Sequence, residues 1–242
     1  MPTETSGSAW DIAEEVAAAF AELPEIDGVL LFGSVARQRN DPGSDIDMLV
    51  VGTDPALTSR GLVAGLPTRL RRHRLAVQYH TRKDLGRLFE TGPAFTEHLR
   101  REAVILRDRD GSLRELIGRQ ARRGISEDDE IALHLDRLHL LEDWPQYNGN
   151  FLACLAQLYA IAKAVIILAL LRCGIAEFDH RRIFDAYRER YPDRSADVDI
   201  VADLAPFARL MAGGEADLPF PYRDAEDQAR AAVAAIRRVS AP

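Results

Sequence analysis

Hydrophobic and polar positions divide the chain into a first half with strand-like runs and a second half with helical spacing. In the first half, short apolar runs predict strands over residues 27–32, 45–51 and 75–81, and an edge strand over 103–107. From residue 127 onward, apolar residues recur every three or four positions and the strand-like runs disappear. The pattern predicts an α+β domain with a mixed sheet, followed by an all-α helical bundle.

The spacing of apolar residues also places the helices and the domain boundary. In the first half, helices are expected over 10–23, 57–74, 84–101 and 113–123, the third with a break at Gly92-Pro93. Gly124-Ile125-Ser126 is followed by four acidic residues, which suit the first turn of a helix capped by Ser126. We therefore expect one domain over residues 1–125 and a second over 126–242.

The most apolar segment runs over residues 151–175 and is long enough to span a bilayer. Gln157, Tyr159 and Lys163 interrupt it, and no second such segment follows. A central helix of the bundle is therefore predicted, and no membrane partner is expected.

Composition narrows the class of protein further. The 242 residues carry a net charge of −7 and are 47% hydrophobic, as in ordinary globular proteins. This charge argues against broad nonspecific binding to nucleic acid, although it leaves a local basic groove open. Cys154 and Cys173 suit reduced thiols, and the N-terminus lacks the features of a signal peptide, so a cytoplasmic location is expected. A homo-oligomer is compatible with the sequence.

The candidate chemistry lies where two predicted strands meet a turn. An apolar run enters Gly33-Ser34, and Asp45 and Asp47 begin the next run. Because side chains alternate along a strand, both carboxylates point the same way, which is unfavourable unless a cation lies between them. Mg²⁺ (or Mn²⁺) binds carboxylates together with phosphate oxygens. Gly33 allows the backbone to approach a phosphate closely.

Gly33-Ser34, a spacer ending in residues 41–44, and Asp45-x-Asp47 resemble the signature of the DNA polymerase β-like nucleotidyltransferase superfamily, in its minimal branch. The resemblance implies transfer of a nucleoside monophosphate from a nucleoside triphosphate to a hydroxyl acceptor, which would be a small molecule, a protein or an RNA. Asp45 and Asp47 would be the catalytic metal ligands. Gly33 and Ser34 would bind the nucleotide phosphates.

Several polar residues near this motif have two interpretations. Arg37 would either bind a phosphate bidentately or be a solvated helix residue. Ser44 would either bind phosphate or complete a turn. Gln38 stands where the family usually has glycine. A cluster of arginines would either steer a triphosphate or an RNA end, or simply end a solvated helix; its members are Arg69, Arg71, Arg72 and Arg74.

The third strand departs from the family, which normally presents a third carboxylate there as metal ligand and base. Gln78 holds the matching position and cannot act as a base at neutral pH. His80 faces the same side and would either replace that group as base or ligand, or be a partly buried strand residue. The sequence therefore leaves open a weak or inactive nucleotide-binding module with a regulatory, antitoxin-like role.

The second half resembles the HEPN-like (higher eukaryotes and prokaryotes nucleotide-binding) helical bundles that accompany minimal nucleotidyltransferases. The likeness depends on the long apolar helix, the passage from Gly174 to His180 and a final amphipathic helix. It implies a bundle over about residues 127–240.

Overall fold

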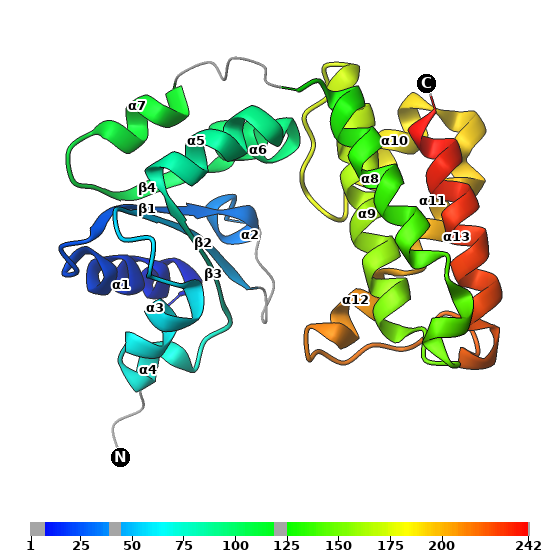
Figure 1. Cartoon of the computed structure of the whole chain (residues 1–242), viewed down its shortest axis with the longest axis horizontal. Helices are drawn as coiled ribbons and strands as arrows, with labels where there is room; N and C mark the ends of the chain where they lie inside the picture. The colour runs from blue at the N-terminus through cyan, green and yellow to red at the C-terminus, as the bar shows by residue number, and fades with distance from the viewer. Residues whose placement is uncertain (1–7, 39–44, 119–124, 242) are drawn as a thin grey trace. The chain divides into compact units, whose positions relative to one another are not determined.

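The computed structural model describes residues 8–38, 45–118 and 125–241. The chain divides into two compact units, residues 1–124 and 125–242 (Figure 1). The first unit contains all of the described strands and the second is helical, which confirms the predicted α+β class.

The N-terminal unit is built on a mixed four-stranded sheet with the order β3-β2-β1-β4. The central strand β1 pairs antiparallel with both of its neighbours, whereas β2 and β3 are parallel. The predicted strands are confirmed to within one residue at each end. Their bounds are β1 Ile26–Phe32, β2 Ile46–Gly52, β3 Leu75–Thr81 and β4 Val104–Asp108.

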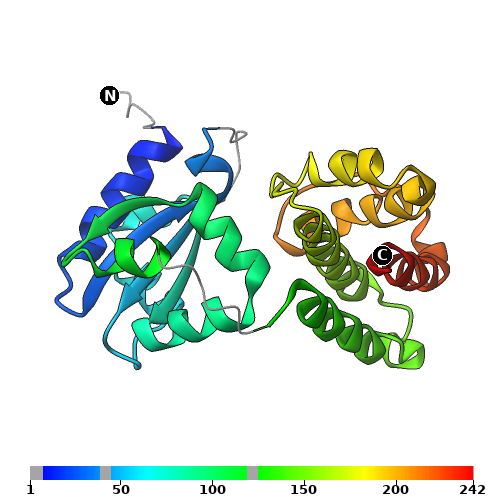
Figure 2. The same ribbon diagram turned by 90° about the horizontal axis from the view of Figure 1, so that it is seen from above.

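Helices cover both faces of this sheet, so that each face has its own apolar core. One core joins Met48 and Val50 to α1 (Ala9–Ala21), α3 (Ser59–Gly65) and α4 (Thr68–Arg71). The other joins Leu49 and Val51 to α5 (Arg82–Thr91), α6 (Pro93–Glu102) and α7 (Ser112–Gly118). Figure 2 shows α1 in blue and the α5–α6 pair in green on opposite sides of the strands.

The structure corrects the single helix expected over residues 57–74. Two short helices, α3 and α4, replace it, because Leu66 is extended with ψ of 152° immediately before Pro67. A proline ring disfavours helical backbone in the residue that precedes it. The break predicted at Gly92-Pro93 is confirmed, since α5 ends and α6 begins there.

The C-terminal unit is a bundle around one long helix, α9 (Leu152–Arg172). Its capping box at Ser126 starts α8 where the sequence predicts it. The remaining helices contact α9 or one another. They are α8 (Glu127–Leu141), α10 (Ile183–Arg190), α11 (Ser195–Ala202), α12 (Ala205–Met211) and α13 (Ala225–Ser240), with short turns of helix at Trp144–Tyr147, Pro192–Arg194 and Tyr222–Asp224. The resemblance to HEPN bundles stays a prediction.

By length and composition, α9 is the one helix in the described ranges that could cross a membrane. Its side chains Leu155, Leu158 and Val165 are fully buried in the bundle core. The helix therefore has the central position that its sequence predicts. Both cysteines are free thiols, as expected.

Candidate functional site

The β1–β2 pair places Asp47 beside the Gly-Ser turn. Asp47 is the cross-strand partner of Phe32, and Gly33 follows at once as the first residue of α2 (Gly33–Ala36). Gly33 has a positive φ of 72°, and a Cβ on it would lie 2.2 Å from Oδ2 of Asp47. Because Gly33 has no side chain, the Asp47 carboxylate can pack against the backbone of this turn.

Asp45 lies immediately before β2 and forms an ion pair. Its Oδ1 is 2.7 Å from Nε of Arg74, and the two side chains are 43% and 47% exposed. Ile46 and Met48 are buried in the core on the α1 side, so the alternation predicted around Asp47 is present. Both aspartates thus lie at the same end of β2, where β1 turns into α2.

Arg37 caps the C-terminal end of α2 and is tied to the end of α6. It forms an ion pair with Glu102, whose Oε2 also lies 2.9 Å from Nε2 of His98. The His98 ring meets Phe32 edge-on, with centroids 5.7 Å apart. Sequence analysis missed this cluster. The only signal for it was the spacing of four residues between His98 and Glu102, which places the two on one helix face.

The cluster also sets the charge of Glu102. Burial raises the pKa of this carboxyl, but hydrogen bonds from His98 and Arg37 outweigh burial, and the net effect lowers the pKa below its ordinary value of 4.5. Glu102 is therefore a carboxylate at neutral pH, and it orients the guanidinium of Arg37 beside the Gly-Ser turn.

A lowered pKa predicts a pH dependence of folding stability. Because folded Glu102 binds its proton less readily than the unfolded chain, its contribution is fully present above about pH 5 and is lost as pH falls through the lowered pKa. We expect Glu102→Gln to reduce the free energy of unfolding by about 2 kcal/mol at pH 7. The difference from wild type should shrink toward pH 3, as measured by urea unfolding. Glu90→Gln, at an exposed position, should show no such convergence.

The pairing of β3 with β2 shows where Gln78 and His80 lie relative to Asp47. Ala76 is the neighbour of Asp47, whereas Gln78 lies beside Leu49 and is exposed. His80 lies beside Val51, four positions from the neighbour of Asp47, or about 13 Å along the strand. Burial lowers the pKa of His80, partly opposed by Asp84. The structure therefore does not bring His80 to the two aspartates.

Two further sequence predictions concern the turn itself. Gln38, where the family usually has glycine, has a positive φ of 56°, which accounts for that preference. Ser34 is the second residue of α2 and is half-buried. Ser44 and the rest of the 41–44 spacer lie outside the described residues.

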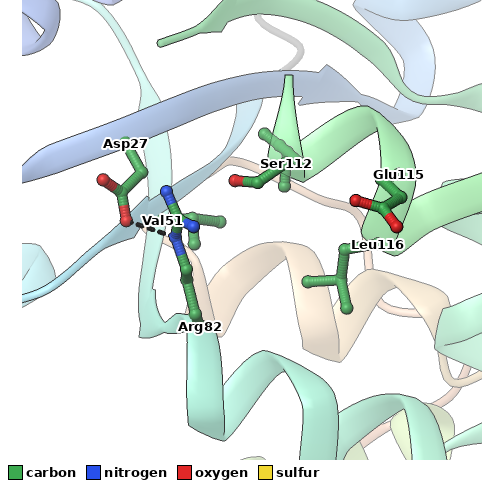
Figure 3. Close-up of a pocket in the computed structure, with 7 residues that line it drawn as sticks. Asp27, Val51, Arg82, Ser112, Glu115 and Leu116 are labelled. Carbon is green, nitrogen blue, oxygen red and sulfur yellow. Dashed lines mark hydrogen bonds and ion pairs between the residues drawn. The ribbon is translucent and has the colours of Figure 1, made fainter. Parts of the chain in front are cut away.

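A separate hollow of about 270 Å³ lies on the α7 side of the sheet, near Val51 and therefore away from Asp47 (Figure 3). Arg82 crosses it, with Nε 2.6 Å from Asp27 and a terminal nitrogen 2.8 Å from Asp110. Figure 3 shows Arg82 pointing toward Asp27, with Ser112 and Glu115 on the opposite wall. Arg82, Asp27 and Asp110 form ion pairs with one another, and these pairs do not involve Asp45 or Asp47.

The acid pair fits a divalent metal that arrives with a phosphate. In the part of the chain that the structure describes, no three His, Cys, Asp or Glu side chains gather as a complete protein cage. Mg²⁺ commonly takes only one or two carboxylates and completes its shell with substrate phosphates and water. Asp45 and Asp47 provide that smaller set, and Gly33 keeps the space beside Asp47 free of a side chain.

One comparison with known proteins covers the residues of this site. The family model described as "Nucleotidyltransferase domain" matches residues 13–106. No curated protein matches the chain. A solved structure, the nucleotidyltransferase-like protein from Exiguobacterium sibiricum 255-15, is similar with a TM-score of 0.39 and 15% identity, over 97% of this chain and 74% of that chain. The matched residues, 13–106, include the Gly33-Ser34 turn and both aspartates, so this part of the chain is similar to the nucleotidyltransferase domain family.

Proposed function

We propose that this domain transfers a nucleoside monophosphate from a nucleoside triphosphate to a hydroxyl acceptor, with Mg²⁺ or Mn²⁺ held by Asp45 and Asp47. The observation that supports this most directly is the contact of Asp47 with the turn at Gly33. It puts a carboxylate and the first backbone amides of α2 beside the same space. A metal-bound triphosphate needs both kinds of group.

The chain's own residues have simple roles in such a reaction. The turn at Gly33 and Ser34 would hold the phosphates, and the two carboxylates would hold a metal, whose charge would offset the negative charge that develops during the displacement. The acceptor oxygen forms a bond to the α-phosphorus. The bond from that phosphorus to the bridging oxygen breaks, and pyrophosphate leaves with its electron pair. The proton of the acceptor hydroxyl goes to a base or to solvent.

One observation favours the second candidate, a nucleotide-binding module with little catalysis. Ala76, beside Asp47, can neither bind a metal nor accept a proton, and Gln78 lies farther along β3. Loss of a general base costs roughly 10²–10⁴ in rate. A nucleotide would still bind through the turn and the two aspartates. This would suit a regulatory, antitoxin-like component.

Labelled nucleotides separate the two candidates. The protein is incubated with α-labelled ATP, GTP, CTP and UTP and with Mn²⁺ or Mg²⁺, and label is counted on the protein itself, on pooled RNA and on aminoglycosides. The proposal expects transfer from at least one nucleotide, and it expects EDTA to abolish that transfer. Transfer that survives EDTA contradicts metal dependence. Thermal stabilisation by a nucleotide without transfer to any acceptor supports the module instead.

A further inference from the structure

Arg74 is held at the acid pair by two separate contacts. Its carbonyl oxygen accepts a hydrogen bond of 2.8 Å from the amide of Ile46, which fixes its backbone at the start of the β2–β3 pairing. Its side-chain Nε lies 2.7 Å from Oδ1 of Asp45. Both side chains are nearly half exposed, so a ligand from solvent can reach the pair.

The other arginines of the same cluster are engaged elsewhere or lie apart. Arg69 pairs with Glu15, and Arg71 bonds to Thr68. Arg72 caps the C-terminal end of α4 through its backbone. Of these four arginines, Arg74 is the one that contacts an aspartate of the proposed metal site. The two interpretations of the cluster can therefore be separated at this residue.

Arg74 and a metal would compete for the same carboxylate, that of Asp45. An exposed ion pair contributes little to stability, typically 1 kcal/mol or less. A divalent cation with an attached triphosphate is therefore able to displace the guanidinium from Asp45. The displaced side chain stays near the site, because the Ile46 hydrogen bond holds its backbone. A phosphate is then its best partner, since a guanidinium matches two phosphate oxygens at once.

We propose that Arg74 is a phosphate-binding residue of this site. Its guanidinium pairs with Asp45 in the nucleotide-free protein. When a metal replaces the guanidinium at Asp45, the side chain binds the triphosphate tail of the substrate. This inference rests on the proposed function, because it assumes that Asp45 holds the metal. It adds a ligand for the triphosphate that the Gly-Ser turn alone does not supply.

Two binding measurements on the full chain test the exchange without any assay of transfer. Mn²⁺ alone is titrated into wild type and Arg74→Ala by electron paramagnetic resonance, and Mn²⁺ with inorganic tripolyphosphate is titrated by calorimetry. Tripolyphosphate removes any dependence on the base. We expect Arg74→Ala to bind Mn²⁺ alone about threefold more tightly, because the competing cation is gone. It should bind the Mn²⁺–tripolyphosphate complex about tenfold more weakly, because a charged hydrogen-bond donor is lost.

The diagnostic result is that Arg74→Ala raises the affinity for Mn²⁺ alone and lowers the affinity for the Mn²⁺–tripolyphosphate complex. Arg71→Ala is the matched control, because it removes the same charge from the same arginine cluster, and both affinities should stay near wild type. Arg74→Lys, which keeps the charge but loses the fork of donors, should give intermediate tripolyphosphate affinity. Equal effects in Arg71→Ala and Arg74→Ala would indicate that the summed positive charge of the arginine cluster attracts the ligand, and would overturn the inference.

The failure of the proposed function gives a different result. If wild type binds neither Mn²⁺ nor its tripolyphosphate complex, the metal site itself is wrong, and the role of Arg74 falls with it. If wild type binds both and Arg74→Ala binds them equally well, only the role of Arg74 is overturned. Thermal unfolding of each variant checks the fold, and a pair that is nearly half exposed should leave the melting temperature nearly unchanged.

Discussion

Replacing Gly33 with alanine is expected to lower nucleotidyl transfer by about 100-fold, even though Gly33 has no reacting group. The new Cβ would lie 2.2 Å from Oδ2 and 3.1 Å from Cγ of Asp47, so the carboxylate must move. A displacement of about 1 Å in a catalytic group costs on the order of 10² in rate. The positive φ of 72° adds about 1–2 kcal/mol of backbone strain for an L-residue.

Gly111→Ala separates the clash from the strain. Gly111 has nearly the same φ, 75°, but a Cβ there meets nothing within 4 Å. Both variants should lose similar unfolding free energy from the backbone term, and only Gly33→Ala should lose transfer and Mn²⁺–tripolyphosphate binding. Equal activity in the two variants would show that Asp47 has no role at this turn.

The fold of the N-terminal unit follows closely from its sequence pattern because its strands are short apolar runs between polar turns. Strand β3 has the predicted bounds, residues 75–81, and the helix break at Gly92-Pro93 is where proline places it. The positions of Asp45 and Asp47 on one face follow from the period of two along a strand. These features depend on local sequence, which is why they are readable without the structure.

The partners of the site residues depend instead on which strands become neighbours. The parallel pairing of β2 with β3 brings Arg74 next to Asp45, and nothing in the local sequence specifies that register. The same pairing makes Ala76, not Gln78, the neighbour of Asp47. Likewise, Glu102 meets Arg37 only because α6 leads into β4, which pairs with β1. Such contacts join residues 29 to 65 positions apart.

The register of β2 and β3 also shows which residue of β3 lies beside Asp47. Gln78 lies beside Leu49, two positions along β3 from the neighbour of Asp47 and on the same face. The residue whose side chain leaves the sheet next to Asp47 is Ala76. That Gln78 holds the position of the family's third carboxylate stays a prediction, and the neighbour of Asp47 on β3 is a small apolar residue.

Asp47→Asn is expected to have the largest effect of all on transfer, a loss of about 10³-fold or more. Asparagine keeps the size of the side chain and its fit against Gly33, so that steric effects are small. It removes the negative charge, and metal stabilisation of the transition state contributes several kcal/mol, which corresponds to a loss of this order. The measurement is the initial rate of label transfer at saturating Mn²⁺.

Asp136→Asn, at an exposed position of α8, is the matched control and should transfer at the wild-type rate. Binding of Mn²⁺–tripolyphosphate should fall in Asp47→Asn and stay unchanged in Asp136→Asn. If Asp47→Asn kept transfer within tenfold of wild type, a metal at this carboxylate would be excluded as the source of catalysis. Phosphate binding at the turn, or a metal held by Asp45 after displacement of Arg74, would then have to carry the reaction.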